Sequence, residues 1–153
     1  MHAGVPGGAF TVIAFMLDAR LAADSHLLAS GPLSELRLMD DARFSWLVLV
    51  PRVSGASELI DLDELSQALL LREINQCCQL LRDCTPCDKL NIGALGNVVR
   101  QLHVHVLARL VGDAAWPGPV WGAGTRQALA ADARDQRLHL LRSHLHAPGW
   151  HLP

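Results

Sequence analysis

The chain has 153 residues, a length that suits one domain large enough to bury a core. Half of its residues are hydrophobic, 18% are charged and the net charge is −2, which argues against global disorder and against broad binding to nucleic acid. No apolar run approaches the roughly 20 residues of a membrane helix, and residues 1–9 contain no Lys or Arg. We therefore expect no membrane span, no secretory leader and a cytoplasmic protein.

The first part of the chain predicts a short helix followed by a β-hairpin. Residues 10–25 carry apolar side chains at helical spacing and indicate the helix. Residues 34–40 alternate, with Leu36 and Leu38 on one face, and predict a half-buried strand. After a polar turn, the apolar residues 46–50 predict a central strand that ends at Pro51. These two strands would pair as the hairpin.

The strongest helical pattern covers residues 61–84. Asp61 is expected to cap this helix, with Glu64 reaching back in a capping box, and Thr85-Pro86 is expected to end it. An apolar stripe that must face the sheet comprises Leu62, Leu65, Leu69, Leu70, Ile74, Cys77, Cys78 and Leu81.

The second half predicts two strands, an aromatic loop and a helix. A short strand is expected at 89–92, a turn at 93–96 and a long strand at 98–110, where Arg109 is interpreted as a structural ion-pair partner. In the loop, Trp116 and Trp121 would shape either a substrate mouth or a dimer seam. An amphipathic helix over 125–145 carries the apolar residues Leu129, Leu138, Leu141 and Leu145. Helices outside a sheet of hairpins indicate an α+β class.

Four cysteines raise the question of a metal or redox site. Cys84 and Cys87 have the C-x-x-C spacing of redox and zinc motifs. A redox pair usually lies at a helix N-terminus, whereas this pair follows a predicted helix, and a zinc site needs two more ligands. We interpret the cysteines as buried or incidental, and we expect no metal ion and no cofactor.

The most informative stretch is residues 101–107, Gln-Leu-His-Val-His-Val-Leu. On a strand, Gln101, His103 and His105 would emerge on one face about 7 Å apart, while the residues between them enter the core. Near neutral pH an imidazole acts as nucleophile, acid or base. The alternatives are a polar sheet face that arose by chance and a metal site at the two histidines, for which a third ligand is missing.

This motif resembles the signature of the histidine-triad superfamily of nucleotide hydrolases and transferases, His-φ-His-φ-His-φ-φ, where φ is hydrophobic. The chain keeps the second and third histidines and carries Gln101 in place of the first. The likeness extends upstream through Asn91-Ile92-Gly93 and Gly96-Asn97, and downstream through Trp116-Pro117-Gly118. It covers about residues 25–122 and leaves the last helix outside.

The resemblance implies a HIT-like α+β fold with an antiparallel sheet of about five strands and flanking helices. In this reading, residues 1–9 are a mobile N-terminus and residues 10–124 form the HIT-like domain. Residues 125–153 are a helical extension packed on the same domain. A homodimer that binds a purine nucleotide, with neither a nucleic-acid nor a membrane partner, is expected.

The resemblance also implies a reaction at the α-phosphate of a nucleoside monophosphate conjugate or a dinucleoside polyphosphate. His103 would be the nucleophile that forms a nucleotidyl-histidine, and His105 would bind a phosphate oxygen or help to protonate the leaving group. The expected phosphate or ribose contacts come from Asn91, Asn97, Gly96 and Asp40, and the apolar wall of the base site comes from Leu36 and Leu38.

Gln101 is expected to belong to the catalytic residues and to orient His103 in place of the first histidine, so that activity is retained. The glutamine nevertheless keeps two other readings open. An amide never carries charge or takes up a proton, so the chain could be a noncatalytic nucleotide-binding or sensing protein. A structural partner protein with a vestigial site would have no nucleotide affinity at all.

Overall fold

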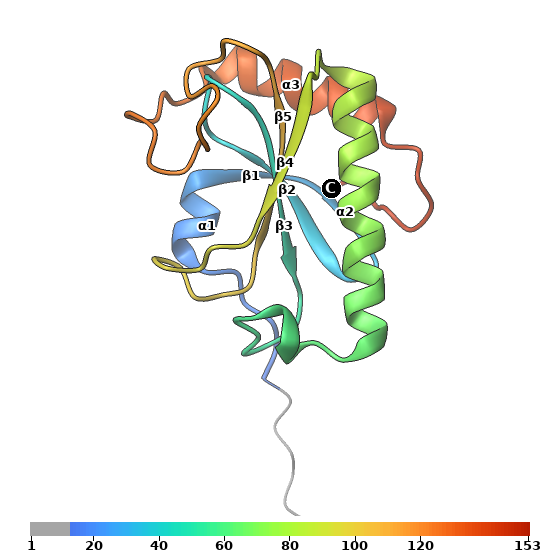
Figure 1. The fold of residues 1–153 in the computed structure, drawn as a ribbon. Helices are drawn as coiled ribbons and strands as arrows, with labels where there is room; N and C mark the ends of the chain where they lie inside the picture. The colour runs from blue at the N-terminus through green and yellow to red at the C-terminus, as the bar shows by residue number, and fades with distance from the viewer. Residues whose placement is uncertain (1–12) are drawn as a thin grey trace, which may run out of the picture.

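A computed structural model describes residues 13–153 and contains one five-stranded sheet flanked by helices. The strand order is β1-β2-β3-β5-β4, and every neighbouring pair is antiparallel. Figure 1 shows α2 along one face of this sheet, with α1 and the loop after β5 on the other. The predicted α+β class and five-stranded sheet are confirmed, while the predicted mobile segment 1–9 lies outside the described residues.

The predicted hairpin is formed by β2 (Ser34–Met39) and β3 (Ser45–Pro51). A further strand, β1 (Ser25–Ser30), pairs with β2 and was not expected from the sequence. Its register shifts between Leu27 and Ala29, so its side chains do not alternate regularly along the strand. A pattern search at period two therefore misses it.

The helix observed within the predicted range 10–25 is much shorter than that range. Helix α1 spans Ala19–Asp24 and begins where the Asp18 carboxylate accepts a hydrogen bond from the Arg20 amide at 2.8 Å. It ends at Ser25, whose backbone is already extended. Residues 10–12 of the predicted helix lie outside the described part of the chain.

Helix α2 (Glu64–Cys84) is confirmed, but its predicted cap is wrong. Asp63 caps it, because the Asp63 side chain accepts from the Ser66 amide at 2.7 Å. Asp61 instead ends a short 3-10 helix, η1 (Leu59–Asp61), where its carboxylate accepts the amides of Ser57 and Glu58.

The apolar stripe of α2 meets the sheet as expected, with one exception. Leu70, Cys77 and Leu81 are fully buried, whereas the predicted stripe member Leu65 is 71% exposed. Leu65 lies in the first turn of α2, where the sheet does not cover it. None of the helices within residues 13–153 has the length and apolarity to cross a membrane.

The motif strand is shorter than the predicted range 98–110. Strand β4 (Lys89–Gly93) is followed by a loop, and β5 spans only Val104–Arg109. The amide of Leu102 donates to the carbonyl of Ala56 at 3.0 Å, outside the sheet ladder. Residues 101–103 therefore form a loop that leads into β5 and do not pair with a neighbouring strand.

The C-terminal helix also begins later than expected. Helix α3 spans Ala131–His144, while residues 125–130 have no helical structure. The Gln127 carbonyl accepts from the Ala42 amide, and the Leu129 amide donates to the Asp40 carboxylate. These bonds hold the segment against the turn between β2 and β3, so its backbone is not free to form helical bonds.

Each face of the sheet has its own hydrophobic core. The larger core lies beneath α2 and α3 and includes Leu36, Leu38, Val104, Val106 and, from α3, Leu138 and Leu141. The smaller core joins Phe44, Trp46, Leu107 and Val120 on the opposite face. That second face carries the side chain of His105, which stacks against Trp46 and Trp121.

Candidate active site

His103 is the last loop residue before β5, and a backbone carbonyl fixes the orientation of its ring. The His103 Nδ1 donates a hydrogen bond to the carbonyl oxygen of Gln101 at 2.7 Å. A carbonyl oxygen only accepts, so in the neutral ring the proton is on Nδ1 and the lone pair is on Nε2. An imidazole in this tautomer presents a nucleophilic Nε2.

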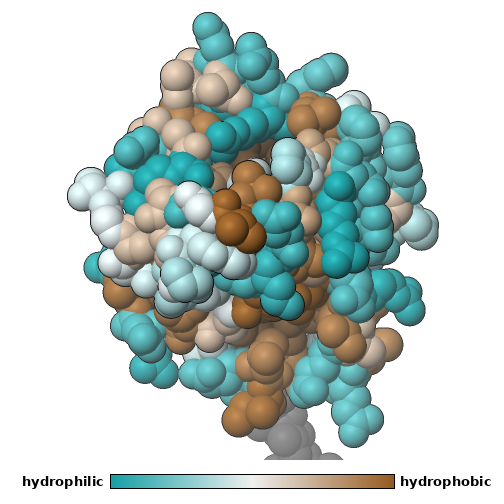
Figure 2. Space-filling model, turned by 45° about the horizontal axis from the view of Figure 1, so that its top comes forward, coloured by the Kyte–Doolittle hydropathy of each residue, from teal (hydrophilic) through white to brown (hydrophobic). Residues whose placement is uncertain are grey.

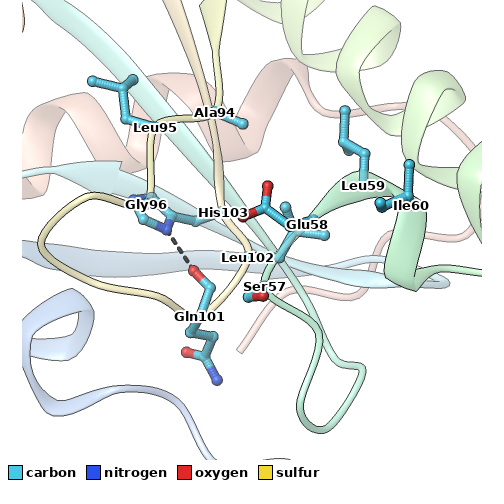
Figure 3. Close-up of a pocket in the computed structure, with 10 residues that line it drawn as sticks. All are labelled: Ser57, Glu58, Leu59, Ile60, Ala94, Leu95, Gly96, Gln101, Leu102 and His103. Atoms are coloured by element: carbon cyan, nitrogen blue, oxygen red, sulfur yellow. Dashed lines mark hydrogen bonds between the residues drawn. The ribbon is translucent and has the colours of Figure 1, made fainter.

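A hollow of about 340 Å³ lies beside this ring (Figure 3). His103 is 8% exposed and shares the lining with Gly96 and Ala94 of the loop after β4. Figure 3 shows Leu59 and Ile60 of η1 on the side of the hollow away from His103. Figure 1 places η1 at the lower end of the molecule, and hydrophobic side chains are exposed at that end in Figure 2.

The side chain of Gln101 does not join the imidazoles. Its amide oxygen accepts from the Asp18 amide at 2.8 Å, and its Nε2 donates to the Met16 carbonyl at 2.8 Å. The expectation of a row of three polar side chains on one strand face is therefore wrong, because Gln101 lies in the loop and points away from His103 (Figure 3). It is the backbone carbonyl of Gln101 that contacts the His103 ring.

His105 is held between two tryptophans. Its Nδ1 accepts a hydrogen bond from the indole Nε1 of Trp46 at 2.9 Å, and its ring centroid lies 5.6 Å from that of Trp121. Burial, together with the charge of His103, lowers the pKa of His105 to about 3. His105 is only 6% exposed and does not line the hollow, although its ring centroid is 4.9 Å from that of His103.

The loop between β4 and β5 brings two other predicted residues to this region. Gly96 has a φ of +73°, which favours glycine, and it lines the hollow beside His103. Asn97 lines an adjoining hollow of about 490 Å³ together with Arg100 and Glu58. Gly96 thus lines the hollow at His103 and Asn97 lines the adjoining one, while the phosphate contacts expected of both stay predictions.

Asn91 and Asp40 are used elsewhere in the fold. The Asn91 side-chain oxygen accepts from Arg109 Nη1 at 2.7 Å. The Asp40 carboxylate accepts from the Leu129 amide and lies 3.6 Å from His26 Nε2 and 3.7 Å from Arg126 Nη1. Neither residue lines the hollow at His103, and their phosphate and ribose contacts stay predictions.

Leu36 and Leu38 do not wall this site. Both are buried in the core beneath α2 and α3, on the face of the sheet opposite His105. Their alternation was interpreted correctly as one buried face. The sequence does not show which of the two sheet faces carries the histidines. The assignment of Leu36 and Leu38 to the base site is wrong for that reason.

Sequence reasoning missed the contributions of Trp46 and of the loop before α2. Trp46 was interpreted only as part of a central strand, yet its indole holds His105. Ser57, Glu58 and η1 line the hollow because the Leu102–Ala56 hydrogen bond draws the two loops together. No local pattern signals such a contact, since the two loops are more than 40 residues apart in the sequence.

The interpretation of Arg109 as a structural ion-pair residue is confirmed by its ion pair with Asp113. Its guanidinium is buried and donates to both carboxylate oxygens of Asp113, to Asn91 and to the Gly118 carbonyl. Hydrogen bonds from Arg109 lower the pKa of Asp113 to about 2. This network ties the loop after β5 to the end of the strand.

Cys77 belongs to the larger core, and the other three cysteines pack against it. All four thiols are free, and burial raises the pKa of Cys77, Cys78 and Cys84. Within the described residues, no three His, Cys, Asp or Glu side chains are grouped so that they could hold a metal ion.

Comparisons with known proteins agree with this geometry. The family model for the HIT domain matches residues 20–111. A histidine-triad protein from Bradyrhizobium japonicum is 47% identical, with a TM-score of 0.84, and the match covers 87% of this chain and 99% of that one. A HIT protein from Sinorhizobium meliloti is 43% identical, with a TM-score of 0.83 over 86% of this chain and 97% of the other.

A third solved structure, a histidine-triad protein from Marinobacter aquaeolei, is 39% identical, with a TM-score of 0.84 over 86% of this chain and 96% of the other. A search of curated proteins gives no match. The family model covers more than half of the chain, and these three structures extend the likeness over most of it. The chain belongs to the HIT-domain family.

Proposed function

We propose that this protein is a hydrolase or transferase that acts at the α-phosphate of a nucleotide through a covalent nucleotidyl-histidine on His103. In the first step, His103 Nε2 forms a bond to the α-phosphorus, the bond from phosphorus to the leaving group breaks, and the leaving group keeps that electron pair and takes up a proton from solvent. In the second step, water attacks the same phosphorus and gives up a proton to solvent, the N–P bond breaks with its electron pair returning to Nε2, and the nucleoside monophosphate is released. The substrate is a nucleoside monophosphate conjugate or a dinucleoside polyphosphate.

The hydrogen bond from His103 Nδ1 to the Gln101 carbonyl carries this proposal. It leaves the Nε2 lone pair free, it holds the ring against rotation, and it strengthens as the ring becomes cationic during attack. The hollow beside the ring has room for a phosphate, and Gly96 brings backbone to its edge. Backbone amides and the Asn97 amide are the donors we assign to the phosphate oxygens.

The glutamine at position 101 is compatible with activity. The group that orients the nucleophile is the Gln101 backbone carbonyl, which any residue supplies. Its side chain instead anchors residues 16–18. Replacing the first histidine of the motif by glutamine therefore leaves the orientation of His103 intact.

His103→Ala tests the mechanism. The wild-type protein should release AMP from adenosine-5′-phosphoramidate or diadenosine polyphosphates and should show a nucleotidyl adduct by intact mass. We expect the variant to lose both, with a fall in turnover of at least about a thousandfold, because no other group supplies the nucleophile. His139→Ala, at an exposed position on α3, is the matched control and should keep wild-type turnover. Turnover that persists in His103→Ala would exclude the proposal.

One observation favours a second candidate, a noncatalytic nucleotide-binding or sensing protein. His105 is enclosed by Trp46 and Trp121 and does not line the hollow, so only one imidazole faces it. AMP binding in calorimetry without any product or adduct from the substrate panel would establish this candidate. Absence of nucleotide binding would favour a structural role.

We further propose a cytoplasmic homodimer that prefers a purine base. The outer edge of β4 is the open edge of the sheet, since the tail at His151 pairs with β1 at the other end. Exposed Ile92 on β4 supports an association there. Sedimentation equilibrium and affinities for AMP, GMP, CMP and UMP test these two points.

A further inference from the structure

Trp46 and His105 are buried neighbours on adjacent strands. Trp46 pairs with Leu107 across β3 and β5, so His105 lies diagonally beside it on the same face. The indole Nε1 lies 2.9 Å from His105 Nδ1, and the two side chains are only 8% and 6% exposed. Water therefore does not compete for this contact.

The chemistry of indole decides the protonation of this ring. An indole N–H only donates, so His105 Nδ1 must hold a lone pair and the ring proton of the neutral form is on Nε2. His103 has the opposite arrangement, because its Nδ1 faces a carbonyl oxygen. The two rings, which meet edge to face at 82°, thus present a bare Nε2 on His103 and a protonated Nε2 on His105.

We propose that Trp46 is a positioning residue that fixes His105 as a neutral imidazole with its proton on Nε2. In this state the Nε2–H of His105, whose ring centroid lies 4.9 Å from that of His103, is the donor that we assign to an oxygen of the reacting phosphate, and His105 keeps its proton throughout. Loss of that proton from a neutral ring would leave an imidazolate, so His105 is not the proton source for the leaving group. The catalytic part of this inference rests on the proposed function, whereas the tautomer does not.

The surroundings of His105 support a permanently neutral ring. Adding a second proton would place it on Nδ1, directly opposite the indole N–H of Trp46. Among the described residues, His103 is the titratable group whose charge acts on His105, and it opposes protonation. Trp121 packs on the ring, and within residues 13–153 its own buried Nε1 has no hydrogen-bond partner.

This difference between the two tryptophans provides a matched pair of variants. Trp46→Phe keeps an aromatic ring in place but removes the donor to Nδ1. Trp121→Phe removes an N–H that contacts no acceptor in the described part of the chain. The readout is the pair of imidazole ¹⁵N shifts of His105 in protein labelled with ¹⁵N-histidine. In the wild-type protein we expect an unprotonated Nδ1 and a protonated Nε2 that do not change between pH 5 and pH 8.

In Trp46→Phe, the Nδ1 shift should move toward the protonated value, and the midpoint of the His105 titration should rise by about one pH unit. In Trp121→Phe the tautomer should stay that of the wild type. A protonated Nδ1 in the wild-type protein would overturn the inference, even if Trp46→Phe does not fold. Identical His105 shifts in Trp46→Phe and the wild type would also overturn it.

Kinetics separate this inference from the proposed function. If the protein turns over nucleotides, Trp46→Phe should lower kcat by about tenfold while the dissociation constant for AMP changes by less than about twofold, since the donor is displaced rather than removed. A kcat equal to that of the wild type, with the tautomer changed, would overturn the catalytic part. If no variant and no wild-type protein turns over substrate, the proposed function fails and the NMR result still decides the tautomer.

Discussion

At the residue scale, the two histidines differ through their partners rather than through their own chemistry. His103 donates from Nδ1 to a backbone carbonyl, and His105 accepts at Nδ1 from an indole. One ring therefore carries its lone pair on Nε2 and the other carries its proton there, and the two ring centroids are 4.9 Å apart. Each assignment follows because the partner has only one role: a carbonyl oxygen can only accept a hydrogen bond, and an indole N–H can only donate one.

Acid should destabilise the protein through His105. In the folded state its pKa is about 3, whereas in the unfolded chain it returns to about 6.5, so the unfolded state binds more protons between these values. The stability from this group is complete above about pH 6.5 and is lost as the pH falls toward 3. Between pH 7 and pH 4.5 we expect a loss of about 2 kcal/mol that His105→Gln does not show, measured by urea unfolding. Equal losses in both proteins would contradict this.

At the element scale, the loop after β5 is attached through charge as well as packing. Arg109 at the end of β5 binds Asp113 and the Gly118 carbonyl, and Trp121 further along the loop packs on His105 and over Gly93. A Cβ at position 93 would lie 2.8 Å from the Trp121 ring, so a glycine in β4 allows this close approach. The loop thereby covers one face of the sheet above His105.

Asp113→Asn should loosen this loop. The pKa of Asp113, lowered to about 2 by Arg109, means that the carboxylate stabilises the fold above about pH 4 and that this contribution disappears as the pH falls through 2. At pH 7 the variant leaves the buried Arg109 without its countercharge, and we expect a loss of about 2–4 kcal/mol in the free energy of unfolding. The difference between variant and wild type should shrink toward pH 2. A difference that does not vary with pH would show that the charge is unimportant.

At the scale of the whole molecule, the C-terminal tail returns to the start of the sheet. Ser30 and His151 exchange both backbone hydrogen bonds at 2.8 Å, and the Trp150 indole donates to Gln76 of α2 at 2.9 Å. The Trp150 ring packs over Gly31, where any Cβ would lie within 2.6 Å of it. The tail thus covers the outer edge of β1, which would otherwise be open to pairing.

Removing the tail contact should destabilise the whole domain. We expect Trp150→Ala to lower the free energy of unfolding by about 2 kcal/mol, through lost packing and a lost hydrogen bond. Trp150→Phe keeps most of the packing and should cost about 1 kcal/mol, the value of the bond to Gln76. Chemical denaturation measures both. Wild-type stability in Trp150→Ala would mean that the tail does not contribute to the fold.

The sequence by itself determined the α+β class, the hairpin of β2 and β3, helix α2 and the likeness to the HIT-domain family. These depend on local regularities: the alternation at residues 34–40, the helical stripe beneath Leu70 and Cys77, and the spacing of the two histidines. A single sequence is enough to detect these patterns, because the pleat of a strand and the turn of a helix repeat every few residues.

Only the tertiary structure decided which groups surround the histidines. The register of β3 against β5 sets Trp46 beside His105, and a single bond between Leu102 and Ala56 sets η1 beside His103. The same long-range bonds turn Gln101 toward residue 16, commit Asp40 to Leu129 and delay the start of α3. Such contacts join segments distant in the chain, and no local pattern records a partner that is defined only when the sheet and loops are assembled.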